Sequence, residues 1–140
     1  ERLDLGEWSD EFALWVAGLH KLSKGNDHLL KMDVNLRNFI YSDGQIYGLD
    51  FEQLGYGDIR TDLGNICFFI LTNTPSFRKE KNIIMRQFLK SYEKHSKTEL
   101  KEMGKFLLQA WAEAKKRRKL NIYSDFTCLN GSLPAGYVKR

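Results

Sequence analysis

The chain has 140 residues and a mass of 16.4 kDa, which is enough for one domain with its own hydrophobic core. Hydrophobic residues make up 42%, aromatic residues 13% and charged residues 29%, a balance that excludes a disordered or low-complexity chain. No apolar run approaches the ~20 residues that cross a bilayer, and the first residues lack a signal-peptide pattern. Two cysteines, Cys67 and Cys128, are too few for a disulfide framework, so we expect a cytoplasmic protein with no membrane partner.

The charges are unevenly distributed along the chain. Residues 1–62 contain 12 acidic and 6 basic residues, and residues 63–140 contain 6 acidic and 16 basic ones. The first half is therefore acidic although the whole chain has a net charge of +4. Clustered carboxylates are tolerated where a bound cation compensates them, so this half is the place to look for a metal–nucleotide site.

The first predicted helix begins near Ser9, which precedes two acids that suit a helix N-terminus. Apolar residues then recur at steps of three and four and give one apolar face: Phe12, Trp15, Val16, Leu19 and Leu22. His20 lies beside that face, where a lone histidine is more often a packing or capping residue than a catalytic base. The segment 23–26 ends the helix, and residues 28–30 are predicted to form a short buried strand.

The segment from Lys31 to Asp50 contains the strongest local signal. Two short apolar runs, 38–41 and 46–49, flank an Asp43-Gly44 pair, which predicts an antiparallel hairpin. The hairpin brings Asp50 back beside Asn38, and their side-chain oxygens form the kind of site that Mg²⁺ prefers. Asp33, on the preceding loop, then faces whatever the metal holds. This arrangement predicts phosphoryl transfer, in which the protein positions a hydroxyl and neutralises phosphate charge.

The rest of the chain is predicted to be mainly helical. Residues 55–58 are interpreted as a structural turn, and Thr61 or Asp62 as the cap of a buried helix over 63–71. A second helix is expected from about Phe77 to Lys94, with Ile84, Phe88, Leu89 and Tyr92 on its inner face. A capping-box pattern over 96–99 predicts a third helix that continues to about Leu120. The stripe on this helix is interpreted as core: Leu100, Met103, Phe106, Leu107, Ala110, Trp111 and Ala114.

Residues 115–119, Lys-Lys-Arg-Arg-Lys, form the one block of like charges. Cations at a helix C-terminus suit the helix dipole, so a solvated last turn is the leading interpretation. The alternatives are a contact with an anionic substrate or with nucleic acid. Aromatic residues are not interleaved with the block, which counts against nucleic acid.

Four motifs in register resemble the catalytic and metal loops of the kinase superfamily, and more closely those of the aminoglycoside phosphotransferase and choline kinase-like family. In that family a loop reading roughly H-G-D-x-x-x-x-N precedes a hairpin, followed by I-D-[FW]-E, G-x-G-D and D-L-[AG]. The corresponding residues here are Lys31-Met32-Asp33, Asn38, Leu49-Asp50-Phe51-Glu52, Gly55-Tyr56-Gly57-Asp58 and Asp62-Leu63-Gly64. The resemblance covers residues 14–71; one such motif is weak evidence, and four in order are strong.

The resemblance implies an ATP-dependent phosphotransferase that transfers the γ-phosphate to a hydroxyl of a small molecule. It implies Asp33 as the catalytic base and Asn38 and Asp50 as ligands of the nucleotide-bound Mg²⁺ or Mn²⁺. Lys31, which replaces the usual histidine, and Asp62 would brace the catalytic loop. Two further residues have open roles. Arg37 either contacts phosphate or is solvated. Glu52 is either the acid that follows the metal-binding aspartate in kinases of small molecules or a surface carboxylate that pairs with Arg60.

The predicted fold is α+β and mainly helical, a kinase-like C-terminal lobe in which a small β-hairpin carries the site. We expect residues 1–120 to form this lobe, with a catalytic loop at 31–38 and a metal loop at 50–52, and residues 121–140 to form a tail. No glycine-rich phosphate loop is present, so an N-terminal ATP lobe is missing from the chain and the fragment alone is expected to be inactive. That lobe or a second chain is the expected partner.

Two other functions remain open at this point. The first is an inactive kinase-like domain that binds or scaffolds, which the lysine at position 31 favours. The second is a small atypical protein kinase of the tRNA-modification type, which the basic block 115–119 favours and Glu52 disfavours.

Overall fold

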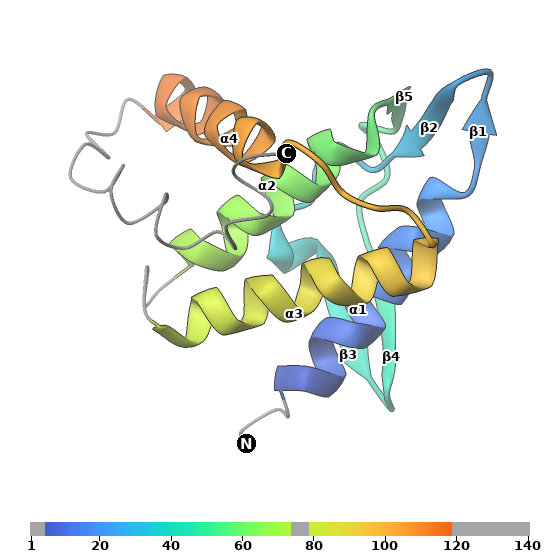
Figure 1. The fold of residues 1–140 in the computed structure, drawn as a ribbon, viewed down its shortest axis with the longest axis vertical. Helices are drawn as coiled ribbons and strands as arrows, with labels where there is room; N and C mark the ends of the chain where they lie inside the picture. The colour runs from blue at the N-terminus through green and yellow to red at the C-terminus, as the bar shows by residue number, and fades with distance from the viewer. Residues whose placement is uncertain (1–4, 74–78, 119–140) are drawn as a thin grey trace.

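The computed structural model describes residues 5–73 and 79–118, which form an α+β fold. Within them lie four helices: α1 (Leu5–His20), α2 (Ile59–Thr72), α3 (Lys79–Ser96) and α4 (Met103–Arg118). Helix α1 packs against α3, and α2 packs against α4 (Figure 1). Helix α2 also contacts α3, so it lies between the other elements of the helical core. None of the described helices is long and apolar enough to cross a membrane.

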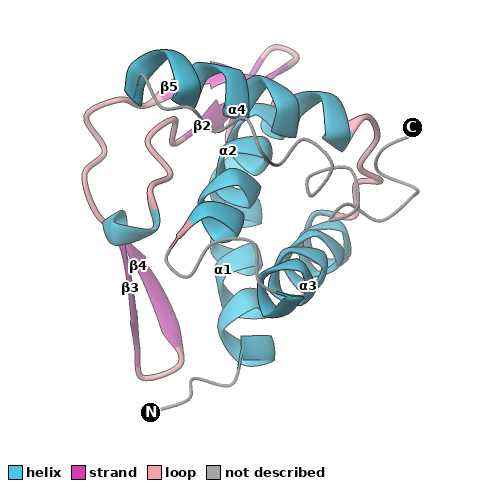
Figure 2. Ribbon diagram, turned by 90° about the vertical axis from the view of Figure 1, so that its left-hand side faces the viewer, coloured by secondary structure: helices cyan, strands magenta, loops and turns pink. Residues whose placement is uncertain are grey.

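Two small antiparallel sheets accompany the helices. Strands β1 (Ser23–Lys24), β2 (Asp27–Leu30) and β5 (Gly55–Gly57) form one sheet in the order β1-β2-β5. Strands β3 (Phe39–Ser42) and β4 (Gln45–Gly48) form the other. This hairpin lies alongside α1 (Figure 2), and Ile46 of β4 is buried in the hydrophobic core. A single 3₁₀ turn, η1 (Leu36–Asn38), leads into β3.

The predicted hairpin is confirmed, and its turn explains the register. Asp43 and Gly44 have φ angles of 51° and 74°, the left-handed pair that a two-residue type I′ turn requires. Asp tolerates this region better than most residues and Gly does so without strain. The turn therefore fixes Ile40 opposite Tyr47 and Phe39 opposite Gly48.

Helix α2 is the centre of the core, as predicted for residues 63–71. It buries a continuous apolar set, namely Leu63, Ile66, Cys67, Phe68, Phe69, Ile70 and Leu71. Gly64 lies on the side of α2 that faces α4, where a Cβ atom would come within 2.7 Å of the carbonyl oxygen of Phe106. The predicted inner face of α3 is buried as well, and so are the α4 residues of the predicted stripe except Phe106, which is partly buried.

Two predicted helix starts are wrong because tertiary contacts, not the local cap signals, set them. Helix α1 begins at Leu5, so Ser9 is a buried residue inside the helix and not its cap. Leu22 lies beyond the end of α1 and is 57% exposed, so it does not belong to the apolar face. Helix α4 begins at Met103 and not near residue 97; the Ser96 hydroxyl accepts a hydrogen bond from the Thr98 amide (3.2 Å) in the connecting loop.

The start of α2 is also different from the prediction. Asp58 is its N-cap, with the side chain accepting a hydrogen bond from the Arg60 amide at 2.9 Å, so Thr61 and Asp62 lie in the first turn. Residues Gly55–Gly57, predicted as a turn, form strand β5 because they pair with β2. The predicted start at Phe77, the predicted end near Leu120, the tail 121–140, Lys119 and Cys128 lie outside the described residues.

Candidate functional site

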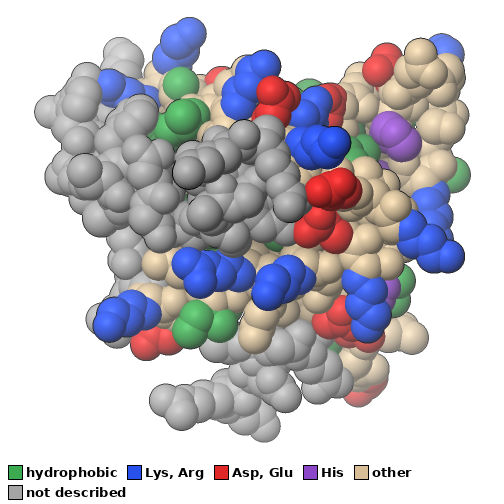
Figure 3. Space-filling model, in the orientation of Figure 1, with side chains coloured by type: hydrophobic (Ala, Val, Ile, Leu, Met, Phe, Trp, Pro, Cys, Tyr) green, Lys and Arg blue, Asp and Glu red, His purple; other side chains and the backbone are tan. Residues whose placement is uncertain are grey.

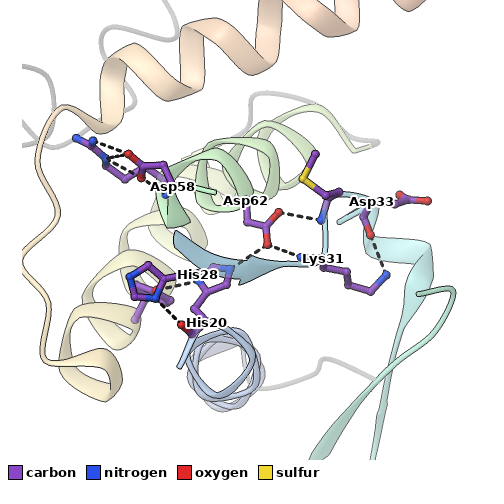
Figure 4. A network of polar contacts seen from close by, with 9 residues as sticks. His20, His28, Lys31, Asp33, Asp58 and Asp62 are labelled. Atoms are coloured by element: carbon purple, nitrogen blue, oxygen red, sulfur yellow. Dashed lines mark hydrogen bonds and ion pairs between the residues drawn. The ribbon is translucent and has the colours of Figure 1, made fainter. Parts of the chain in front are cut away.

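The Asp62 carboxylate, fully buried in the first turn of α2, holds the loop that follows β2. Its Oδ2 accepts a hydrogen bond from the Lys31 amide at 2.8 Å, and its Oδ1 accepts one from the Met32 amide at 3.0 Å. Figure 4 shows the carboxylate at the centre of these contacts. This is the backbone contact that the sequence analysis expected of Asp62.

His20 also contacts Asp62, and Tyr92 in turn contacts His20. His20, which is 3% exposed at the end of α1, lies with Nε2 at 2.9 Å from Asp62 Oδ2. A carboxylate only accepts hydrogen bonds, so this ring nitrogen donates. His20 Nδ1 is 2.8 Å from the Tyr92 hydroxyl of α3. Burial, together with the negative charges of Asp62 and Asp58, raises the pKa of Tyr92. The chain of contacts therefore joins α1, α2 and α3 to the loop.

Lys31 ties the two predicted site loops together. Its side chain is buried, with 1% exposure for the residue, and Nζ donates to the main-chain carbonyls of Asp33 (2.9 Å) and Asp50 (2.8 Å). Both hydrogen bonds end on main-chain carbonyl oxygens and not on carboxylates. The ammonium also lies over the rings of Phe39 and Phe51, at 5.3 and 5.0 Å from their centroids. Burial lowers the pKa of Lys31, and the charges of Asp33, Asp50 and Asp62 oppose this shift.

Two residues of these loops have left-handed backbone conformations. Met32 has a φ of 68° and Asp50 a φ of 59°. A long side chain such as methionine is an outlier in this region, and such conformations persist only where neighbouring contacts hold them. The Asp62 bond to the Met32 amide and the Lys31 bond to the Asp50 carbonyl provide those contacts. The strain therefore lies next to Asp33 and at Asp50, the residues predicted to do the chemistry.

Asn38 and Asp50 lie beside each other at the open end of the hairpin. The Leu49 amide donates to the Asn38 carbonyl at 2.7 Å, which places Asp50 one residue beyond this pair. Asn38 is 9% exposed, and its Nδ2 atom is buried with no hydrogen-bond partner among the described residues. A buried amide without a partner is uncommon and calls for a ligand or a reorientation. A 180° flip of the Asn38 side-chain amide would place its Oδ1 atom where Nδ2 now lies.

This donor set fits a magnesium ion that is held mainly by a nucleotide. Mg²⁺ commonly takes one or two protein oxygens and completes its shell with phosphates and water. The exposed Asp50 carboxylate and the unpartnered Asn38 amide match that pattern. Within residues 5–73 and 79–118 no group of three His, Cys, Asp or Glu side chains forms an all-protein metal cage.

Asp33 borders a cleft of about 430 Å³ between its loop, α2 and α4. Its carboxylate points away from Asp62 (Figure 4), while Oδ1 accepts a bond from the Asn35 amide at 3.3 Å. This is the Asx-turn that the residue type permits, and among the described residues it leaves Oδ2 without a hydrogen bond. The cleft volume lies within the range of about 300–1,000 Å³ typical of small-molecule sites. Its lining is mostly polar: Met32, Asp33, Val34, Asn35, Arg37, Gln53, Thr61, Asn65, Phe69, Glu113 and Arg117.

The structure places the two residues with open roles differently. Arg37 is exposed and lines the cleft. Glu52 is exposed, and the pairing with Arg60 predicted for it is wrong, because Arg60 pairs with Asp58 (2.7 Å) and Glu102 (3.3 Å). These bonds to Arg60 hold the pKa of Asp58 below its ordinary value.

Several large apolar side chains around the hairpin are exposed. The cross-strand pair of Ile40 and Tyr47 is about half exposed, and the segment after β4 adds three more, Leu49, Phe51 and Leu54. Exposed apolar residues that gather in one region mark surfaces that bind a partner.

Some site residues escaped the sequence analysis. The sequence gives no local signal that His20 contacts Asp62 or that Tyr92 contacts His20, because these pairs lie 42 and 72 positions apart. The placement of His20 beside an apolar face was the one indication of a structural role. Glu113 and Arg117 reach the cleft because α4 packs on α2, and that packing is not visible in the sequence. No protein-family model, curated protein or solved structure matches the chain.

Proposed function

We propose that this chain is the substrate- and metal-binding lobe of an ATP-dependent phosphotransferase that acts on a hydroxyl of a small molecule. One observation carries the proposal: Lys31 Nζ bonds the carbonyls of both Asp33 and Asp50, 17 residues apart, and so holds a free carboxylate beside a predicted metal site. The neighbouring cleft has room for a small acceptor.

In this mechanism Asp33 would orient the acceptor hydroxyl through Oδ2 and take its proton as the acceptor oxygen bonds to the γ-phosphorus and the bond from that phosphorus to the bridging oxygen breaks, which releases ADP. Asn38 and Asp50 would hold the Mg²⁺ that neutralises the nucleotide phosphates. Asp62 and Lys31 hold the loop through its backbone amides and carbonyls and so fix the position of Asp33. The exposed apolar side chains at 47–54 are the proposed contact surface for an ATP lobe or for a second chain.

The first test is calorimetric titration of the chain with ATP, with and without Mg²⁺. We expect nucleotide binding that requires the metal and is lost in Asp50→Ala. Asp43→Ala is the matched control, because Asp43 is also exposed and left-handed (φ 51°) but lies at the far end of the hairpin. Equal loss of binding in both variants would reduce the Asp50 effect to backbone strain and contradict its role as a ligand.

A kinase-like domain that binds without catalysis is the second candidate, and Lys31 is the observation that favours it. The lysine fills the position of the histidine in the motif and lies buried against both loops. In a chain that contains the ATP lobe, phosphate transfer abolished by Asp33→Asn would exclude this candidate. Metal-dependent nucleotide binding without any transfer would support it.

A further inference from the structure

The cleft beside Asp33 contains a charge pattern that the proposed reaction does not yet explain. Arg37 lies on the catalytic loop, and Arg117 lies in the last turn of α4. The two guanidinium groups come from segments 80 residues apart and border the same cleft as the candidate base. Within residues 5–73 and 79–118 neither arginine forms an ion pair.

We propose that the acceptor is a small alcohol that also carries an oxyanion, a carboxylate or a phosphate, which Arg117 and Arg37 bind while Asp33 receives the hydroxyl. This inference rests on the proposed phosphotransferase function and names its substrate class. A guanidinium group offers parallel N–H donors whose spacing matches the two oxygens of a carboxylate or phosphate.

The balance of charges in the cleft disfavours a cationic acceptor. The lining contains two arginines and two carboxylates, those of Asp33 and Glu113. Asp33 is needed for the hydroxyl, and Glu113 lies one turn before Arg117 on the same side of α4. A cation in this cleft would lie beside two guanidinium groups, and such like-charge contacts are costly. An anionic alcohol meets both arginines and can donate its remaining hydroxyls to Glu113.

The surroundings strengthen the attraction for an anion. Lys115 and Lys116 precede Arg117 in the last turns of α4. The face drawn in Figure 3 also has Lys and Arg side chains along α3, which does not line the cleft. A positive potential of this kind raises the local concentration and the association rate of an anionic ligand.

Arg117 is the residue that tests the inference, because Arg37 directly precedes the proposed metal ligand Asn38. The experiment uses four sugars that share the glucose ring and differ in charge: glucose 6-phosphate, glucuronate, glucose and glucosamine. Each is titrated at the same ionic strength while the amide signals of Asn35 and Asn65, two cleft residues, are followed by NMR. We expect at least one of the two anionic sugars to bind more tightly than glucose and glucosamine. Preference for one anion identifies phosphate or carboxylate as the recognised group.

We expect Arg117→Gln to weaken the preferred anion about tenfold, the typical effect of losing a charged hydrogen-bond donor. Arg86→Gln, at an exposed arginine of α3 outside the cleft, should leave the affinity unchanged. The inference is overturned if glucose or glucosamine binds as tightly as both anions, if neither anion binds at tens of millimolar, or if Arg117→Gln has no effect.

Titration with Mg²⁺–ATP separates the two proposals. Metal-dependent ATP binding that is lost in Asp50→Ala, together with no preference for anionic sugars, would overturn only the substrate class. Anion binding that depends on Arg117, without any binding of Mg²⁺–ATP, would instead contradict the phosphotransferase function.

Discussion

The loop around Asp33 has two sides that differ in burial and in hydrogen bonding. On the inner side, Asp62, His20 and Lys31 are almost completely buried, and each makes at least two hydrogen bonds. On the outer side, Asp50 and Arg37 are exposed and Asp33 is half-buried with one weak contact. The inner side determines where the loop lies, and the outer side presents free groups to a ligand. Substitutions on the two sides should therefore affect different measurements.

The largest effect on stability is expected for Asp62→Ala. The change leaves the amides of Lys31 and Met32 and a ring nitrogen of His20 buried without their acceptor. We expect the free energy of unfolding to fall by about 3–5 kcal/mol, measured by urea denaturation. Asp33→Asn, on the outer side, should change it by less than about 0.5 kcal/mol. Similar losses in the two variants would remove the distinction between the sides.

A smaller effect is expected for Asp58→Ala, at the N-cap of the helix that carries Asp62. Loss of the cap and of the pairing with Arg60 should cost about 1 kcal/mol at neutral pH. Because Arg60 lowers the pKa of Asp58 in the folded state, the charge stabilises the fold above the ordinary pKa of 3.8 and stops doing so as the pH falls through the lower folded value.

The gap in stability between wild type and Asp58→Ala should thus be constant from about pH 7 to pH 5 and shrink below the ordinary pKa of 3.8. Asp58→Asn is the matched control, since an asparagine still caps the helix but does not titrate. Its gap from Asp58→Ala should not change with pH. A wild-type gap that shrinks no more than the Asp58→Asn gap as the pH falls below 3.8 would contradict a contribution from the carboxylate charge.

Among the inner-side residues, a smaller effect on stability is expected for Lys31→Met, because Lys31 is buried but its bonds position the Asp33 and Asp50 loops. Methionine keeps the stem between Phe39 and Phe51 and removes a charge that burial disfavours, so the free energy of unfolding should change by less than about 1 kcal/mol. Without the ammonium, the Asp33 and Asp50 loops lose their common donor. We expect metal-dependent ATP binding to weaken about tenfold in calorimetry.

Lys90→Met, at an exposed lysine of α3, controls for the loss of one positive charge. It should change neither stability nor ATP binding. Unchanged ATP binding in Lys31→Met would show that the bond between the two loops is not needed for the nucleotide site.

The sequence predicted the features that depend on short stretches of chain. The Asp43-Gly44 turn fixed the hairpin and with it the neighbourhood of Asn38 and Asp50, and the spacing of Phe88, Leu89 and Tyr92 gave the inner face of α3. Helix starts were predicted less well. Ser9 has every local property of a cap, yet the chain before it is helical too.

Contacts between distant segments set the limit of sequence analysis at the site. The pairing of His20 with Asp62, the bonds of Lys31 to two carbonyls and the approach of Arg117 to the Asp33 cleft all depend on how helices pack. The phosphotransferase reaction, its nucleotide and its metal stay predictions. What the structure adds is a geometry in which the residues named for that reaction lie together.

The position of Tyr92 in the Asp62 network has a consequence for the order of events during folding. The hydrogen bond between Tyr92 and His20 joins residues 72 positions apart, and closing so long a segment costs chain entropy that only an assembled core repays. Helices α1, α2 and α3 must therefore dock before the loop bearing Asp33 has its full set of restraints. A partly unfolded chain would contain every residue of the candidate site and still have no ordered loop around Asp33.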